Sequence, residues 1–270
     1  MNQPLPQADE AAPEPELTGV RNLRDVGGLA TGDGLRVRRG RLYRSGHLAH
    51  ATEQDAAYLR SLGLHTVFDL RNDADVALEG PDVALEGVRY VSMPLSDPAA
   101  GAEFWRVVRD GDLPALRAAL GDGRAERTMA SSYRTLILER TGEHGRLLRE
   151  LARESVPALL HCAAGKDRAG TSIAVVLLAV GVRREEIERD YLLSNAPHRR
   201  YRVRRGPDAA PATSPEVVEL LRPLFEARTA YLRAAFDAME ERWGSVDRYL
   251  SEGLSLTAED RERLRVLLLE

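Results

Sequence analysis

The sequence predicts an α/β fold, in which a central, mostly parallel sheet is flanked by helices and the C-terminal region forms a helical cap. Three observations carry this prediction. Short β-rich segments alternate with segments of helical spacing, which is typical of parallel strands joined by crossover helices. Residues 156–161 form a continuous apolar run, as expected of a central strand covered on both faces. Residues 215–270 follow helical spacing throughout.

The first part of the chain is predicted to form short strands and one helix. Thr52 is a typical N-cap and Asp55 occupies the capping-box position, so we expect a helix from there to about Leu62, ending at Gly63. Residues 19–40 are rich in glycine and are predicted to form a hairpin region. β-rich runs bounded by turn residues then predict strands at 41–44, 65–70 and 88–93.

The second part is predicted to be mainly helical around the strand at 156–161. Helical spacing runs through most of 101–153, including 102–110, and one long helical segment is expected at 216–243. Two further helices are predicted at 168–180 and 183–194. We expect residues 1–17, rich in proline and acidic side chains, to be a disordered leader. One domain, 18–270, then includes a cap of about 196–270.

Composition excludes several classes of protein. The net charge of −4 at pH 7 gives no basic field for nucleic acid. The longest apolar run, residues 173–182, is about half the ~20 residues that a membrane-spanning helix needs. The single cysteine, Cys162, excludes an internal disulfide framework and a multi-thiolate metal site. The leader lacks the pattern of a signal peptide, so a cytoplasmic protein is expected, while its oligomeric state stays open.

The most informative segment is HCAAGKDRAG at 161–170, which runs from the predicted strand into a helix. A short loop at a helix N-terminus presents backbone N–H groups that hold a phosphate dianion. Arg168 can grip two phosphate oxygens through its planar guanidinium. Cys162 at the loop floor then lies in line with phosphorus, in surroundings that favour a thiolate. The alternative is a buried structural cysteine, but the five-residue spacing to Arg168 and the interior Gly165 favour phosphate chemistry.

This loop resembles the signature of the cysteine-dependent protein tyrosine phosphatases, in a bacterial branch with a Lys-Asp-Arg ending that phosphoinositide phosphatases partly share. Further stretches resemble the same branch and cover 19–28, 40–48, 62–71, 189–195 and 231–244. The resemblance implies a tyrosine-phosphatase-like fold, no cofactor and no metal. It also implies a phosphomonoester hydrolase acting on a phosphotyrosine protein, with dual or phosphoinositide specificity as a further option.

Matching positions imply a role for each loop residue. Cys162 would form a phosphocysteine, Arg168 would bind the phosphoryl oxygens, and His161 would orient the loop. The phosphate cradle would be formed by Ala163, Ala164, Gly165, Lys166, Ala169 and Gly170. We expect Lys166 to add positive charge at the pocket rim. Polar residues in the resembling stretches are expected to support the fold rather than contact substrate; they are Asn22, Arg24, Asp25, Asp69 and Arg71.

Two points stay open at this stage. The leaving oxygen needs a proton, and either Asp97, after the strand at 88–93, or Asp167, inside the loop, can supply it. The family usually has Ser or Thr where this chain has Ala169, and that hydroxyl helps the thiolate to leave. Its absence predicts slow hydrolysis of the phosphocysteine. A phosphate-binding module with weakened turnover is therefore the alternative function.

Overall fold

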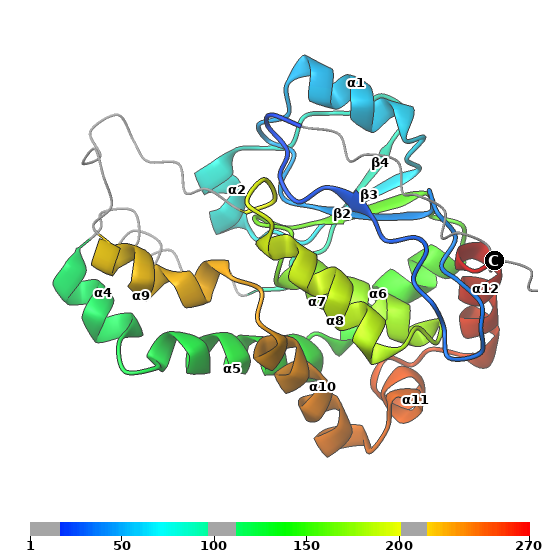
Figure 1. Cartoon of the computed structure of the whole chain (residues 1–270). Helices are drawn as coiled ribbons and strands as arrows, with labels where there is room; N and C mark the ends of the chain where they lie inside the picture. Colours follow the sequence, from blue (N-terminus) through cyan, green and yellow to red (C-terminus); the bar gives the residue numbers. More distant parts are fainter. Residues whose placement is uncertain (1–16, 97–111, 201–214) are drawn as a thin grey trace, which may run out of the picture.

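A computed structural model describes residues 17–96, 112–200 and 215–270, and its centre is a five-stranded sheet (Figure 1). The strand order is β1-β2-β5-β3-β4, with only β1 antiparallel to its neighbour. The strands are β1 (Arg24–Asp25), β2 (Leu42–Ser45), β3 (Thr66–Asp69), β4 (Arg89–Ser92) and β5 (Ala158–His161). The predicted fold class is therefore confirmed.

Helices follow most strands and, with the loops that join them, make up the rest of the described chain. The N-terminal part contains α1 (Glu53–Ser61) and α2 (Asp73–Glu79). Next come α4 (Leu113–Leu120), α5 (Arg124–Leu138), α6 (Thr141–Ala152), α7 (Arg168–Ala179), α8 (Arg184–Leu192) and the 3-10 turn η1 (Leu193–Asn195). The C-terminal helices are α9 (Pro215–Phe225), α10 (Thr229–Trp243), α11 (Val246–Arg248), the π-helical turn η2 (Tyr249–Gly253) and α12 (Ala258–Leu268).

The sheet has a separate apolar core on each face. On the face covered by α1, Leu159 of β5 packs with Val67 of β3 and Leu59 of α1. Leu160, the next residue of β5, belongs to the larger core on the opposite face, to which α5, α6, α7, α10 and α12 contribute. Alternate side chains of a strand point to opposite faces, so a buried central strand must be apolar throughout. This explains the continuous apolar run that ends at His161.

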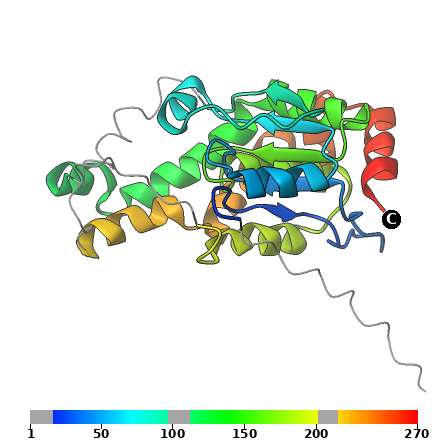
Figure 2. The ribbon, with the colours of Figure 1, turned by 90° about the horizontal axis from the view of Figure 1, so that it is seen from above.

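The helical C-terminal region is present, but its helices lie in two places. α9 packs with α4 and α5 in a lobe that extends away from the sheet, whereas α12 packs on α6 beside the main body (Figures 1 and 2). The prediction of one long helix at 216–243 is wrong, because the chain breaks at residues 226–228. The side-chain amide of Asn195 explains the break: it accepts from Ala227 N at 2.7 Å and donates to Ala227 O at 2.8 Å. These bonds replace those that a continuous helix would supply.

Most other predicted elements are confirmed. Thr52 and Asp55 form the expected capping box at the start of α1. The predicted helix at 102–110 lies outside the described residues. Among the described residues, no helix is long and apolar enough to cross a membrane. One element was missed by sequence reasoning, the short helix α2, although Asn72 and Asp75 form a capping box at its start. This helix proves important because it borders the site.

Candidate active site

Four parallel strands end at one edge of the sheet and bring the site together. The last residues of β2, β5, β3 and β4 lie in one register row, Ser45, His161, Asp69 and Ser92. Because β5 is central, the loop that follows it emerges between the ends of β2 and β3. Ligands of open α/β sheets bind at this carboxyl edge. The topology therefore places Cys162 and its loop where a ligand is expected.

The carbonyl groups of the loop point outwards and are held by the surrounding protein. Ala163 O accepts from His47 N at 3.1 Å, and Ala164 O accepts from the Asn22 side-chain amide at 3.2 Å. Both donors come from segments beside β2, far away in sequence. Asn22 was expected only to support the fold, and this contact shows how it does so.

Arg44 of β2 holds the next two carbonyls. Its Nη2 donates to Gly165 O at 2.8 Å and to Lys166 O at 3.2 Å. In a trans peptide the N–H points away from the preceding C=O. With four successive carbonyls held on the outside, the N–H groups of residues 164–167 face the other side of the loop. This is the arrangement of a backbone anion nest at the start of α7.

Two glycines allow the loop to lie this close to its supports. Gly165 has φ +69°, and a Cβ there would lie 2.3 Å from backbone atoms of Ser45. A Cβ at Gly170 would lie 2.7 Å from Nη2 of Arg44. Gly170 and Ala169 lie in the buried first turn of α7, where N–H groups have no partner within the helix. The space left by Gly170 is thus occupied by the arginine that shapes the loop.

A buried ion cluster fixes Arg44 itself. Asp190 of α8 pairs with Arg44 Nη1 and with Arg24 Nε, each at 2.7 Å, and all three side chains are at most 5% exposed. Burial opposes ionisation of Asp190, but the two guanidiniums outweigh it and hold the pKa of Asp190 at about 2. The cluster therefore fastens β1, β2 and α8 around the loop.

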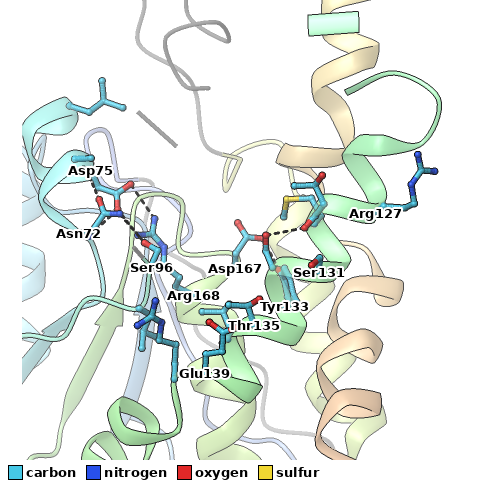
Figure 3. A pocket seen from close by; sticks show the side chains of 18 of the residues that line it. Asn72, Asp75, Ser96, Arg127, Ser131, Tyr133, Thr135, Glu139, Asp167 and Arg168 are labelled. Atoms are coloured by element: carbon cyan, nitrogen blue, oxygen red, sulfur yellow. Dashed lines mark hydrogen bonds and ion pairs between the residues drawn. The ribbon is translucent and has the colours of Figure 1, made fainter. Parts of the chain in front are cut away.

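Arg168, the predicted phosphate ligand, faces α2. Its guanidinium pairs with both carboxylate oxygens of Asp75 and donates to Ser96 Oγ at 3.2 Å (Figure 3). Burial opposes the charge of Arg168, but the neighbouring Cys162 and Asp75 raise its pKa above the ordinary value. Cys162 itself is 2% exposed. The two residues therefore lie at opposite ends of the same loop, and their joint action on phosphate stays a prediction of the loop spacing.

Asp167 lies on the other side of the same opening and is held by two donors. The Tyr133 hydroxyl donates to Asp167 Oδ1 at 2.6 Å (Figure 3). Lys166 Nζ donates to the same oxygen at 2.5 Å. The hydroxyl groups of Tyr133 and Tyr191 also form a hydrogen bond of 2.7 Å. The expectation that Lys166 lies at the pocket rim is wrong: its side chain is 4% exposed. A buried ammonium needs a paired carboxylate, which Asp167 supplies.

His161, directly before the cysteine, is completely buried between acidic residues. Its Nε2 lies 2.9 Å from Asp82 Oδ2 and 3.7 Å from Asp69 Oδ1. Arg71 pairs with both carboxylates, at 2.8 Å to Asp69 and 3.0 Å to Asp82. Burial raises the pKa of Asp82, but His161 and Arg71 more than compensate and lower it below its ordinary value. These contacts fix the end of β5 at the base of the loop.

A cavity of about 1000 Å³ opens in front of Asp167 and Arg168. It lies between α2 and α5, and its lining includes Asp75, Tyr133 and Arg127 (Figure 3). A further arginine of the lining is Arg140. Both apolar and polar side chains border it, and such a cleft suits an organic ligand with an anionic group. The last two residues of the loop, Asp167 and Arg168, are therefore reached from this cavity, whereas Cys162 is not among the residues that line it.

Sequence reasoning named the loop residues but missed most of their partners. Asp97, one of the two proposed acids, lies outside the described residues. Arg44, Asp75, Asp82 and Tyr133 were not identified, because their contacts join distant segments. The capping box at the start of α2 is the one local signal that could have pointed to Asp75.

Fold and loop together define a class: enzymes that handle phosphate esters with a cysteine and an arginine on a strand–loop–helix unit. The comparison with protein families narrows this class. The model of the tyrosine phosphatase family matches residues 15–270, and the chain belongs to this family. It is therefore a phosphatase, an enzyme that hydrolyses phosphate monoesters.

Two relatives extend over most of the chain. One is the triple specificity protein phosphatase PtpB of Mycobacterium tuberculosis, with 34% identity over 273 residues, which cover 92% of this chain and 97% of that protein. The other is a protein of Cupriavidus necator whose name assigns it to the tyrosine-protein phosphatases. It is 33% identical over 244 residues, which cover 88% of this chain and 82% of that protein. The resemblance inferred from the loop is confirmed at the level of the family.

Proposed function

We propose that Cys162 and Arg168 carry out phosphate transfer in two steps. The Cys162 thiolate attacks phosphorus, the bond from phosphorus to the ester oxygen breaks, and the leaving oxygen takes a proton from an acid. Water then attacks the phosphocysteine, releasing inorganic phosphate and the thiolate. The outward carbonyls of residues 163–166 are the observation that carries this proposal, because they turn the loop amides towards the phosphoryl oxygens.

Two positioned side chains support these steps. Asp75 holds Arg168 at the opening, so the guanidinium is oriented before phosphate arrives. Asp167 borders the cavity, and both of its observed contacts go to Oδ1. Its second oxygen, Oδ2, is then the atom suited to exchange a proton with the leaving group or with water. Asp97 remains the other candidate for the first proton transfer.

The role of Cys162 is tested with p-nitrophenyl phosphate. We expect Cys162→Ser to abolish turnover while inorganic phosphate still binds. Turnover that survives in this variant would exclude the cysteine mechanism.

The roles of Asp97 and Asp167 can be distinguished with substrates whose leaving groups differ in basicity. An acid in the first step matters most for a basic phenolate, so its Asn variant should lose about 100-fold in kcat on phosphotyrosine and less on an activated aryl phosphate. A base in the second step gives the same loss on both substrates, together with a larger burst. If neither Asp97→Asn nor Asp167→Asn lowers kcat by about 100-fold, both assignments fail.

The breadth of the cavity supports a substrate range wider than phosphotyrosine. Arg127 and Arg140 line it, and they could contact further anionic groups of a phosphoprotein or phosphoinositide. We propose that both substrate types are hydrolysed, in line with the printed name of the mycobacterial relative. The test is a panel of phosphopeptides and soluble phosphoinositides. The double variant Arg127→Ala, Arg140→Ala should lower kcat/KM on phosphoinositides about 10-fold and leave p-nitrophenyl phosphate unchanged. Equal effects on both would exclude the contact.

A further inference from the structure

A second group of side chains lies beside the phosphate loop and takes no part in the proposed chemistry. His47 and His50 follow β2, and Glu79 is the last residue of α2. Glu79 Oε2 lies 3.4 Å from His47 Nε2 and 3.2 Å from His50 Nε2. The three ligand atoms all lie within 4.8 Å of one another. Two imidazoles and one carboxylate therefore converge on one point.

These distances match those between ligands of a zinc-type ion. Zinc binds imidazole nitrogen and carboxylate oxygen at about 2.0–2.2 Å, so neighbouring ligands of a tetrahedron are about 3.3 Å apart. Two of the separations, 3.4 and 3.2 Å, are close to this value. Two histidines and one glutamate also form an accepted ligand set for zinc, with the fourth position open to water.

The exposure of the three side chains is consistent with an ion site that is open to solvent on one side. The side chains of Glu79 and His47 are 6% and 9% exposed, whereas His50 is 25% exposed. A divalent ion would add positive charge beside the buried Glu79 carboxylate, and the partly open side at His50 would let the ion enter.

The neighbouring cluster of Asp69, Asp82 and His161 is less suitable for a cation. Its three ligand atoms are also close together, but Arg71 already pairs with both carboxylates, at 2.8 and 3.0 Å. A metal ion there would face a guanidinium that pairs with both carboxylate ligands. The cluster of His47, His50 and Glu79 offers two imidazoles instead of one, and imidazole is the commonest metal ligand, so it is the better candidate of the two.

We propose that His47, His50 and Glu79 bind one divalent transition-metal ion of the zinc type. The ion would tie the end of α2 to the segment after β2. Both elements also support the phosphate loop: Asp75, one turn before Glu79, pairs with Arg168, and His47 N donates to Ala163 O. The site would thus be a structural clamp beside the phosphate loop, separate from the reaction itself.

The test is titration of the metal-free full chain with zinc chloride, followed by calorimetry and X-ray absorption. We expect one ion per chain, with nitrogen and oxygen ligands at about 2.0–2.2 Å and no sulfur at about 2.3 Å. His50→Ala and the isosteric Glu79→Gln should each weaken binding by more than about 100-fold, since loss of a second-sphere partner alone costs 10–100-fold.

Two controls separate this site from other zinc ligands. His65→Ala removes an exposed histidine at the opposite end of β3, and Cys162→Ser removes the thiol. Both control variants should bind zinc with wild-type affinity. Zinc should raise the Tm of both controls but leave the Tm of His50→Ala unchanged. The proposal is overturned if the wild type binds no zinc, if either His50→Ala or Glu79→Gln keeps wild-type affinity, or if Cys162→Ser loses it.

Discussion

Replacement of Asp190 by asparagine tests the idea that a buried ion cluster holds the phosphate loop in shape. Asp190→Asn keeps the size of the side chain but leaves Arg24 and Arg44 buried without their carboxylate. Removing one partner of a buried ion pair destabilises a protein by about 3–5 kcal/mol. Burial and the neighbouring Arg44 already lower the pKa of Arg24 to about 10, so the cluster has little tolerance for losing negative charge.

The pKa of Asp190 gives a second, lower value for the stability that the cluster contributes. Its fall from the ordinary 3.8 to about 2 corresponds to about 2 kcal/mol of stability. Because the folded pKa is the lower one, this stability is present above about pH 4 and is lost as the pH falls through about 2. The difference between wild type and Asp190→Asn should therefore shrink over that range.

Urea unfolding at pH 7 measures the effect. We expect a lower midpoint with an unchanged slope, equivalent to about 3–5 kcal/mol, and a lower kcat/KM because Arg44 no longer holds Gly165 O and Lys166 O in place. Glu252→Gln, which breaks an exposed pair with Arg248, is the matched control and should leave the midpoint unchanged. A loss below about 1 kcal/mol for Asp190→Asn would refute the reasoning.

Three further substitutions test the loop. Tyr133→Phe removes the hydroxyl that orients Asp167 and should lower kcat about 10-fold with little change in KM; Tyr191→Phe is the control, and equal effects would contradict this role. Gly165→Ala forces a side chain into the backbone of β2 at positive φ and should destabilise the fold by at least about 2 kcal/mol; a wild-type unfolding midpoint would count against it. Ala169→Ser should raise kcat about 10-fold by assisting thiolate departure, and an unchanged burst and kcat would dismiss that explanation.

The sequence by itself determined the chemistry of the loop. Cys162, Gly165 and Arg168 lie within one strand–loop–helix unit, so their short separation along the chain keeps them close together in space. The apolar run of β5 identified the central strand for a similar reason, because burial on both faces leaves a local signal. The family and the fold class could therefore be predicted without any long-range contact.

Only the tertiary structure decided which distant side chains complete the site. Arg44 reaches the loop because β2 pairs with β5, and Asp82, from the segment after α2, lies 2.9 Å from His161 at the end of β5. Strand order and register are long-range properties that no local pattern encodes. The burial of Lys166 was likewise decided by tertiary packing, because its side chain is only 4% exposed although it carries a charge. The reactive residues of the loop are thus neighbours in the chain, whereas the side chains that hold the loop in place are brought to it by the sheet.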